Sequence, residues 1–470
     1  MSENSADVVL ISTYELGHQP AGIAMPLGFF KREGIRADAL DVSVEGFDAE
    51  KISRAKFIGI SVPMHTALRL GVAIAQEIRR INADGHICFY GLYASLNSDY
   101  LLDTVADSII GGEFETALVE LIKKVLARDE NATERLSIPA GVKTRLQAAM
   151  PVLARLSFSK PERTAMPGLE RYARLDWQGE QRLAGYTEAS RGCLHHCTHC
   201  PIPPIYEGRF FAVPREVVLE DIRQLVEAGA AHITFGDPDF LNGPTHALRV
   251  TESLHQAFPH LTFDFTAKIE HIIKHRELFK SFARYGCIFV VSAVEALSDE
   301  VLMRLEKRHT RNDVTDALNI LREAGIAMRP SLVSFTPWTT LDDFIEVMDF
   351  VERENLIDAV DPVQYSIRLL VPPGSRLLER EETSLWLGKL NQPAFTYDWQ
   401  HPDARMDELQ RQVAVLVEGA AQRNEDTAVT FYRIRELAKV RRGDELAVRN
   451  QALLATHRIK PPRLTEAWFC

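Results

Sequence analysis

Short apolar runs alternate with amphipathic stretches through the first 130 residues of the chain. The apolar runs have the length of strands, and helix-length stretches lie between the later ones, around residues 67–81 and 115–127. Strands that alternate with helices indicate a doubly wound parallel sheet. We therefore expect residues 1–130 to form a Rossmann-like α/β domain. Its expected strands are residues 8–13, 37–42, 57–62, 86–90 and 108–110.

The loops after these strands form the expected ligand-binding edge of this domain, because ligands of such sheets lie beyond the carboxyl ends of the strands. Small residues there let a flat, bulky ligand approach the backbone, and hydroxyls and amides can bind its side chains. The residues expected at this edge are Tyr14, Gly17, His18, Ser61, His65, Gly91 and Gly112.

A second series of strands and helices begins near residue 183. It follows a stretch over residues 131–182 that is rich in proline and arginine and has the pattern of a linker. Strand-like runs then recur at a spacing of roughly 30 residues. Six such β/α units predict a partial parallel (β/α)6 barrel over residues 183–378, with its chemistry at the carboxyl ends of the strands. The expected strands are residues 186–190, 232–236, 262–267, 288–295, 327–335 and 363–370.

Residues 379–470 have a charged, helical pattern and predict a helical C-terminal domain that covers the mouth of the barrel and selects the substrate. Trp386, Trp399 and Tyr432 are interspersed in it. Aromatic residues at helical spacing belong to a core more often than to a cofactor site, so we expect these three in the core.

Charge and composition exclude several classes of function. The net charge of −11 argues against a nucleic-acid binder, which needs a basic surface for phosphate contacts. The N-terminus is polar and acidic, and no apolar run approaches the roughly 20 residues that span a bilayer. Three of the six cysteines lie in one short segment, which fits a reducing compartment. We expect a cytoplasmic protein that binds neither nucleic acid nor a membrane.

The candidate chemistry is concentrated in Cys193, Cys197 and Cys200, which form C-x3-C-x2-C directly after the first expected barrel strand. Three thiolates can hold three corners of a four-iron cluster and leave the fourth iron open, whereas a cluster that only carries electrons is normally closed by a fourth cysteine. The alternative is a structural zinc site that one of three histidines would complete. These histidines are His195, His196 and His199.

The three-cysteine segment resembles the motif of the radical S-adenosylmethionine (SAM) enzymes. The resemblance implies a [4Fe-4S] cluster whose open iron chelates the amino and carboxylate groups of SAM. A Rossmann-like domain ahead of this motif resembles the cobalamin-binding domain of a large branch of these enzymes. The pattern Asp-x-His-x-x-Gly, which marks cobalt ligation by a histidine, is absent. Either the corrin binds without a protein nitrogen, or the domain is a relic, or His18 or His65 is the lower ligand.

The resemblance also implies SAM contacts at the ends of the later barrel strands. A carboxylate there would face the methionyl ammonium, although either aspartate could instead cap the following helix. A buried arginine would pair with the SAM carboxylate. Lys307 and Arg308 resemble further contacts, with a solvated helix end as the alternative. The implied SAM-binding residues are Gly236, Asp237, Asp239, Lys268, Ser292, Glu295, Arg329 and Ser331.

The end of the sequence carries a second resemblance. Residues 466–470, together with residues 191–209, resemble a group of radical SAM proteins whose chains close in Cys-Cys-Ala-Glu-Pro or its selenocysteine version, called the CCAEP/CUAEP group. Here the Ala-Glu-Pro is missing. We expect this tail to pack near the active-site opening, where the thiol of Cys470 could bind a soft metal or metalloid.

Together these features predict a cobalamin-dependent radical SAM transferase that methylates a small or otherwise unidentified substrate. It would receive electrons from an external donor such as flavodoxin or ferredoxin. One alternative is transfer of another SAM fragment, 3-amino-3-carboxypropyl, to a small or soft acceptor. An alternative from a different class is a non-catalytic zinc or iron-sulfur redox sensor.

Overall fold

The N-terminal domain is a twisted sheet with helices on both faces. The computed structural model describes residues 6–128, 137–444, 458 and 460–466. Within these residues the sheet order is β2-β1-β3-β4-β5-β6. Five of its strands are parallel, as predicted: β1 (Val8–Ser12), β2 (Asp38–Asp41), β3 (Phe57–Ser61), β4 (His86–Tyr90) and β5 (Ser108–Ile110).

Alternation along the strands explains the two layers of helices. Val9 and Ile11 of β1 belong to one apolar cluster, whereas Val8 and Leu10 belong to another on the opposite face. Successive side chains of a strand point to opposite faces, so both faces must be covered. Two helices cover one face: α1 (Ala21–Arg32) and α7 (Glu115–Leu126). The other is covered by α3 (Ala49–Arg54), α4 (His65–Ile81), α5 (Leu92–Leu96) and α6 (Ser98–Thr104), and a short helix, α2 (Val42–Glu45), follows β2.

The linker is not a free connection between the domains. Its strand β6 (Val142–Lys143) joins the N-terminal sheet antiparallel to β5. Val152 then pairs with Gly112 at the carboxyl edge of this sheet. A short 3-10 turn, η1 (Leu169–Arg171), precedes β7 (Arg174–Trp177), which leads into the barrel sheet. The linker therefore covers part of the edge that the sequence marks for ligand binding.

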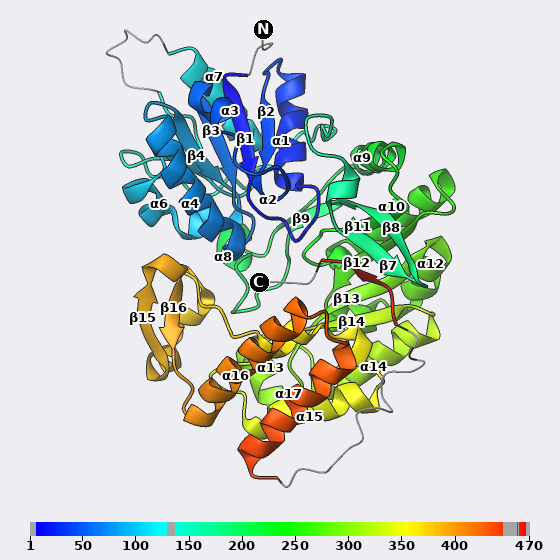
Figure 1. Cartoon of the computed structure of the whole chain (residues 1–470). Helices are drawn as coiled ribbons and strands as arrows, with labels where there is room; N and C mark the ends of the chain where they lie inside the picture. Colours follow the sequence, from blue (N-terminus) through cyan, green and yellow to red (C-terminus); the bar gives the residue numbers. More distant parts are fainter. Residues whose placement is uncertain (1–5, 129–136, 445–457, 459, 467–470) are drawn as a thin grey trace.

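The second domain is a curled parallel sheet in the middle of the chain (Figure 1). Its order within the described residues is β14-β13-β12-β11-β8-β7-β17. The parallel strands are β8 (Glu180–Thr187), β11 (His232–Phe235), β12 (Thr262–Ala267), β13 (Cys287–Glu295) and β14 (Ala327–Leu332). The helices along it are α9 (Arg215–Glu227), α10 (Pro244–Ala257), α11 (Ile269–Lys274), α12 (Phe279–Tyr285), α13 (Asp299–Arg304), α14 (Arg311–Glu323) and α15 (Leu341–Arg353), with 3-10 turns η2 (Phe240–Asn242) and η3 (Arg276–Leu278).

The fold class is confirmed, but the sixth barrel strand expected at residues 363–370 is wrong. Residues Pro362–Ser366 form a 3-10 helix, η5, and only Arg368 makes an isolated parallel bridge, to Phe335. Proline is favoured at the first position of a helix, where its missing N–H leaves no bond unmade, and η5 begins at Pro362, one residue before the expected strand. The sheet is therefore open beyond β14, and η4 (Ile357–Ala359) and η5 lie on that side.

The C-terminal region contains the expected helices and an added hairpin. The helices are α16 (Ala404–Gln422) and α17 (Thr427–Arg442), and the hairpin consists of β15 (Leu387–Asn391) and β16 (Thr396–Trp399). Two 3-10 turns precede the hairpin, η6 (Arg376–Glu379) and η7 (Glu381–Leu385), and a third, η8 (Gln392–Ala394), lies between its strands. Trp399 is buried and its indole N–H donates to the Leu369 carbonyl, so this aromatic residue belongs to the core, as expected.

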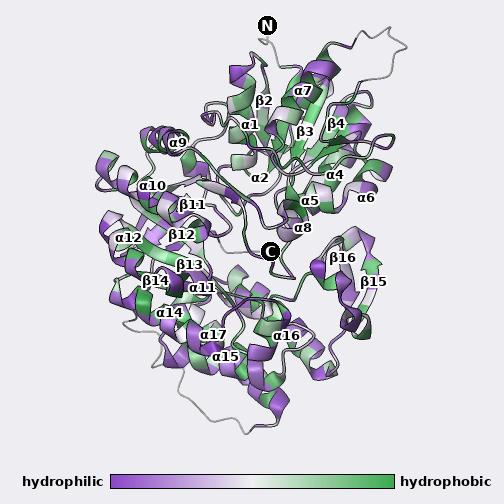
Figure 2. Ribbon diagram, turned by 180° about the vertical axis from the view of Figure 1, so that it is seen from behind, coloured by the Kyte–Doolittle hydropathy of each residue, from purple (hydrophilic) through white to green (hydrophobic). Residues whose placement is uncertain are grey.

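The described end of the chain returns to the barrel. Strand β17 (Arg463–Leu464) pairs antiparallel with β7, and Figure 1 shows it in red alongside β7. Residues 467–470, with Cys470, lie outside the described residues. Figure 2 shows that apolar residues are concentrated on the strands of both sheets and polar residues on the outer helices. No helix among the described residues is long and apolar enough to cross a membrane.

Candidate functional site

The three cysteines lie on one loop, which we call the cysteine loop (residues 192–200), directly after β9 (Ser190–Gly192). Strand β9 pairs antiparallel with β10 (Phe210–Ala212), and α8 (Pro203–Tyr206) lies between these strands. Gly192 has a φ of +73°, and a Cβ there would collide with the Arg209 carbonyl and the Tyr206 ring. The turn into the loop therefore requires glycine.

Neighbouring barrel segments hold the cysteine loop by its backbone. The amide of Leu194 donates to the side-chain oxygen of Asn242 (3.2 Å), and the amide of Thr198 donates to the carbonyl of Leu305 (3.2 Å). Cys193 and Cys197 are buried, and Cys200 is partly buried. The loop is thus a fixed part of the barrel edge.

The spacing of the three thiols does not suit one zinc ion. A single ion with Zn–S bonds of about 2.3 Å would bring its sulfur ligands within about 4 Å of one another. Among the described residues, Cys193, Cys197 and Cys200 do not form a group whose ligand atoms all lie within 4.8 Å. Thiolates at three corners of an iron-sulfur cluster bind three different irons and can be farther apart.

Without a metal, two thiols of the cysteine loop, those of Cys193 and Cys200, favour the protonated form. Burial raises the pKa of the Cys193 thiol and raises that of Cys200 to about 12. Cysteine ligates metals as the thiolate, so binding here must release protons.

The three histidines of the motif point to different partners, so they do not complete a common site with the cysteines. The Nε2 atom of His195 lies 3.3 Å from Asp239, and that of His199 lies 3.6 Å from Glu295. His196 is held by its carbonyl, which accepts from Arg376 (2.7 Å). This divergence also argues against the Cys3His zinc interpretation.

A buried ion pair lies beside the cysteine loop. Lys307 is 2% exposed, and its Nζ atom lies 3.0 Å from Glu295 Oε1. Burial alone would raise the pKa of Glu295, but the charge of Lys307 and the contact with His199 hold it well below its usual range. Burial opposes the charge of Lys307, but Glu295 and the sulfurs of Cys197 and Cys200 raise its pKa. The solvated helix end is therefore wrong for Lys307, whereas Arg308 is exposed.

The two aspartates after β11 have different partners. Asp237 accepts from the Ala189 amide (2.9 Å) and the Ser190 hydroxyl (2.5 Å), so it fixes the chain ahead of the cysteine loop. Burial raises the pKa of Asp237 to about 7. Asp239 caps the next turn by accepting from the Leu241 amide (3.1 Å), as the helix-cap alternative expected. Its second oxygen faces His195 and His271.

The remaining expected SAM contacts lie at or near the same edge. Lys268 is buried, with its Nζ atom 3.5 Å from Glu270, and the Ser292 hydroxyl donates to the Ala267 carbonyl (3.2 Å). Ser331 is half-buried on β14. A Cβ at Gly236 would collide with the Tyr186 ring, so this position requires glycine. Whether these residues bind SAM stays a prediction.

Arg329 lies deeper, at a cavity of about 100 Å³ inside the curled sheet. It donates to Asp361 (2.7 Å) and to the Pro462 carbonyl (3.5 Å). The cavity is also lined by His18 and Leu16 of the first domain and by Leu464 and Glu466 of the C-terminal segment. Both ends of the described chain therefore contribute to the inside of the barrel.

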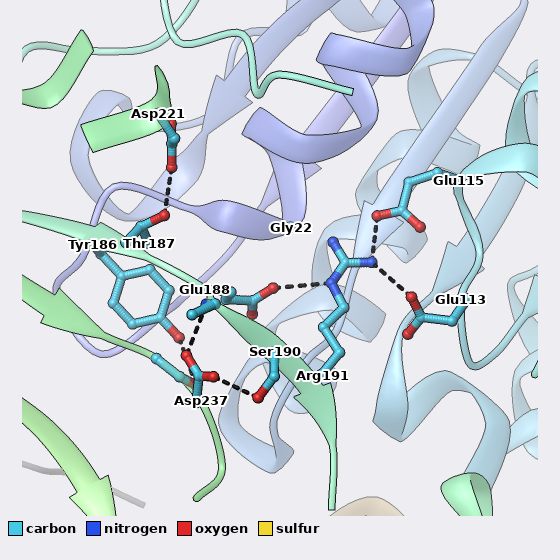
Figure 3. A network of polar contacts seen from close by, with 12 residues as sticks. Gly22, Glu113, Glu115, Tyr186, Thr187, Glu188, Ser190, Arg191, Asp221 and Asp237 are labelled. Carbon is cyan, nitrogen blue, oxygen red and sulfur yellow. Dashed lines mark hydrogen bonds and ion pairs between the residues drawn. The ribbon is translucent and has the colours of Figure 1, made fainter. Parts of the chain in front are cut away.

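The sequence interpretation missed a carboxylate network that joins the two domains, shown in Figure 3. Arg191, two residues before Cys193, lies 2.6 Å from Glu115, 3.5 Å from Glu113 and 3.0 Å from Glu188. Desolvation would lower the pKa of Arg191, but Glu115, Glu113 and Glu188 hold it well above its usual range. Burial raises the pKa of Glu113 to about 7, which Arg191 only partly offsets. The network contains more buried carboxylates than the one guanidinium can neutralise.

The expected cobalamin edge faces the other domains, and protein segments contact it. The His18 ring stacks on the Tyr186 ring at 4.6 Å, and burial lowers its pKa to about 4. His65 Nε2 lies 2.7 Å from the Ala394 carbonyl of the C-terminal region. Gly112 has a φ of +72°, and a Cβ there would collide with the Val152 carbonyl.

The other residues expected at this edge also have a special backbone conformation or a contact with another segment. Gly17 has a φ of +70°, and its carbonyl accepts from the Ala173 amide (2.8 Å). The hydroxyl of Tyr14 donates to Glu466 (3.3 Å). Gly91 has a φ of +102° at the start of α5, and Ser61 is buried beside Gly22.

Comparison with known proteins assigns the barrel. Residues 187–351 match the family model described as the radical SAM superfamily. These residues form a radical SAM domain. The chain is 29% identical over 208 residues to a tRNA-2-methylthio-N(6)-dimethylallyladenosine synthase of Desulfosudis oleivorans, covering 40% of this chain and 42% of that protein. It is 24% identical over 251 residues to a hopanoid C-3 methylase of Methylococcus capsulatus, covering 53% and 47%. The chain thus spans less than half the length of these curated relatives.

Solved structures resemble the fold beyond the radical SAM domain. The cobalamin-dependent SAM radical enzyme OxsB, with aqua-cobalamin bound, aligns with a TM-score of 0.68 over 88% of this chain and 67% of that chain, at 17% identity. The radical SAM methyltransferase TsrM of Kitasatospora setae, with cobalamin and a [4Fe-4S] cluster bound, aligns with a TM-score of 0.59 over 74% of this chain and 73% of that chain, at 17% identity. These likenesses establish the order and architecture of the domains. The resemblance to the CCAEP/CUAEP group stays a prediction.

Proposed function

We propose that this protein binds a [4Fe-4S] cluster, SAM and cobalamin, and transfers a methyl group to a substrate at the mouth of the barrel. The observation that carries the proposal is the cysteine loop, which lies at the carboxyl edge of a radical SAM domain with a buried Lys307–Glu295 pair beside it. When bound, the cluster would reduce one SAM to methionine and a 5′-deoxyadenosyl radical that abstracts hydrogen from the substrate, and cobalamin, methylated by a second SAM with release of S-adenosylhomocysteine, would supply the methyl group.

The residues of the barrel edge fit these groups. Three cysteines are held on a fixed loop, at a spacing too wide for one zinc ion. Lys307 and Lys268 are cations with little exposure, and Glu295 is a buried carboxylate. SAM carries a carboxylate and an ammonium, so charges of both signs at the edge suit its methionyl end. Which of these side chains touches SAM is part of the proposal.

The N-terminal edge fits cobalamin in position, and two of its histidines make only neutral contacts. It faces the barrel and the C-terminal region, as transfer between cobalt and a substrate at the barrel requires. The contacts of His18 and His65 with other segments are a ring stack and one hydrogen bond. A corrin could replace both without leaving a buried charge unpaired. The likeness to OxsB and TsrM, whose structures contain cobalamin, supports this part of the proposal.

The test is a product analysis under anaerobic conditions. We expect the reconstituted protein to hold about four irons and four sulfides per chain and to bind hydroxocobalamin with a spectral change. With SAM and a reductant such as flavodoxin or dithionite, we expect 5′-deoxyadenosine and methionine from reductive cleavage, and S-adenosylhomocysteine from methylation of cobalamin. Release of 5′-methylthioadenosine instead would indicate transfer of the 3-amino-3-carboxypropyl group. Stoichiometric zinc without sulfide after reconstitution would contradict an enzyme of this class.

A further inference from the structure

Beside the cysteine loop, three buried side chains from separate segments face one point. We call His195, Asp239 and His271 the His-Asp-His group. His195 lies in the cysteine loop, Asp239 follows β11, and His271 lies on α11 after β12. Their candidate ligand atoms all lie within 4.8 Å of one another. The three residues are 7%, 0% and 6% exposed, so water does not solvate them freely.

The three side chains point their nitrogen and oxygen atoms toward one another, as the ligands of a metal ion do. One oxygen of Asp239 caps the Leu241 amide, which fixes the carboxylate so that its other oxygen, Oδ2, faces the histidines. Oδ2 lies 2.7 Å from His271 Nδ1 and 3.3 Å from His195 Nε2. All three atoms are buried, and none has a hydrogen bond of good geometry among the described residues. Buried polar atoms that converge without such bonds are expected to have a partner that satisfies them.

The two distances from Asp239 Oδ2 to the histidines are close to those around a first-row divalent metal. Ligands with bonds of about 2.0–2.1 Å lie about 2.9–3.4 Å apart around an octahedral or tetrahedral ion. The two contacts to Asp239 lie close to this range. Two imidazoles and one carboxylate favour Zn²⁺ or Fe²⁺, and sites with three protein ligands leave at least one position for water or a small ligand.

We propose that the His-Asp-His group binds one divalent transition-metal ion, Zn²⁺ or Fe²⁺, separate from the cluster of the cysteine loop. The ion joins the cysteine loop to the ends of β11 and β12. It neutralises the buried Asp239 carboxylate and fixes the loop between Cys193 and Cys197. This second metal does not depend on the proposed transfer reaction.

The test counts metal in matched histidine variants of the full chain. Wild type, His271→Asn and His275→Asn are purified and reconstituted anaerobically with iron and sulfide, and then exposed to Zn²⁺ and desalted. Asparagine is a polar side chain that can donate to Asp239 but is a poor ligand for Zn²⁺, so folding and metal binding are separated. His275 is the control, because its ring lies 5.7 Å from that of His271 but outside the group.

We expect about one metal ion per chain beyond the cluster iron in wild type and His275→Asn, and less than about a tenth of this in His271→Asn. The sulfide content should be equal in all three proteins. A Co²⁺-loaded sample should show ligand-field bands that His271→Asn lacks, without the sulfur-to-cobalt charge-transfer band of a thiolate site. If iron rather than zinc occupies the site, wild type has an iron-to-sulfide ratio above one.

Two results would overturn this proposal. One is a wild-type protein with a full cluster and no further metal. The other is a further metal that persists in His271→Asn or is lost equally from His275→Asn. Cluster sulfide is counted separately from zinc. An absent cluster would therefore contradict the proposed function, and the zinc count would still decide whether the His-Asp-His group binds a metal.

Discussion

The carboxyl edges of the two parallel sheets differ in the kind of contact that they make. At the barrel edge, buried charges surround the cysteine loop, such as Lys307 with Glu295. At the edge of the N-terminal sheet, neutral contacts, such as the Val152 backbone over Gly112 and the Ala394 carbonyl at His65, lie beside the buried carboxylates of Glu113 and Glu115, which face Arg191. Buried charges are costly to keep and cluster at functional sites. Both edges therefore contain buried charge, and only the neutral contacts around His65 and Gly112 could be displaced by a ligand at low cost.

The strongest test of this comparison removes one ligand from the barrel edge. Cys197→Ala, and equally Cys193→Ala or Cys200→Ala, should abolish cluster assembly and SAM cleavage, because each thiolate holds an iron that nothing else binds. Iron, sulfide and the cluster absorption are measured after anaerobic reconstitution. Cys88→Ala is the control, since Cys88 is a core thiol of the N-terminal sheet. A full cluster in Cys197→Ala would refute the assignment.

The next largest effect is expected where the two edges meet. Arg191→Met should lower the free energy of unfolding by about 3–5 kcal/mol, because it leaves the buried carboxylates of Glu113, Glu115 and Glu188 without their cation. Urea unfolding of the apoprotein measures the loss.

Two further variants test the cause of this loss. Arg182→Met removes an ion pair with the exposed Glu180 and should cost less than about 1 kcal/mol. Adding Glu115→Gln to Arg191→Met should restore part of the stability. Equal costs for the two arginine variants would mean that the carboxylate network is not coupled through Arg191.

The sequence predicted the strands and the cysteine loop of the barrel edge better than the contacts between this edge and distant segments. The strands and the cysteine loop are local patterns, so the parallel order and the position of Cys193, Cys197 and Cys200 followed from them. The sixth strand was wrong because apolar content suggested a ladder where Pro362 begins a 3-10 helix instead. Lys307 and Arg308 are adjacent and chemically alike, and only the packed chain determines that the first is buried.

The carboxylate network could not be predicted from local pattern. Glu113 and Arg191 are far apart in the sequence, and nothing in either segment identifies the other as its partner. The pairing of β17 with β7 is equally non-local. Contacts of this kind depend on how the domains pack, which one sequence does not reveal.

A third prediction concerns how the stability of the protein changes with pH through Glu15, a buried carboxylate between the domains. Glu15 accepts from the Gly22 amide (3.2 Å), and burial, followed by the charge of Glu188, raises its pKa to about 8. The folded protein then holds a proton that the unfolded chain releases above pH 4.5, so Glu15 lowers stability as the pH rises from about 4.5 to 8.

Glu15→Gln keeps the acceptor for Gly22 and removes this titration. Its stability relative to wild type should therefore increase across that window, by a few kcal/mol at most. Urea unfolding at pH 5, 6, 7 and 8 measures the difference. Glu120→Gln, a change on the exposed face of α7, is the control and should give a difference that does not vary with pH. A constant difference for Glu15→Gln would mean that Glu15 is ionised throughout.

The smallest effect is expected at His65 of the N-terminal edge, whose contact with the C-terminal region is neutral. His65→Ala removes the hydrogen bond to the Ala394 carbonyl and should lower the free energy of unfolding by about 0.5–1.5 kcal/mol. Because the Asp-x-His-x-x-Gly pattern is absent, we expect cobalt to have no lower nitrogen ligand from His65. The spectrum of bound hydroxocobalamin should then be the same in wild type, His65→Ala and His18→Ala. A shift in His65→Ala alone would identify His65 as the lower ligand. The edge would then have a built-in metal contact, and the difference between the two edges would be smaller than the structure indicates.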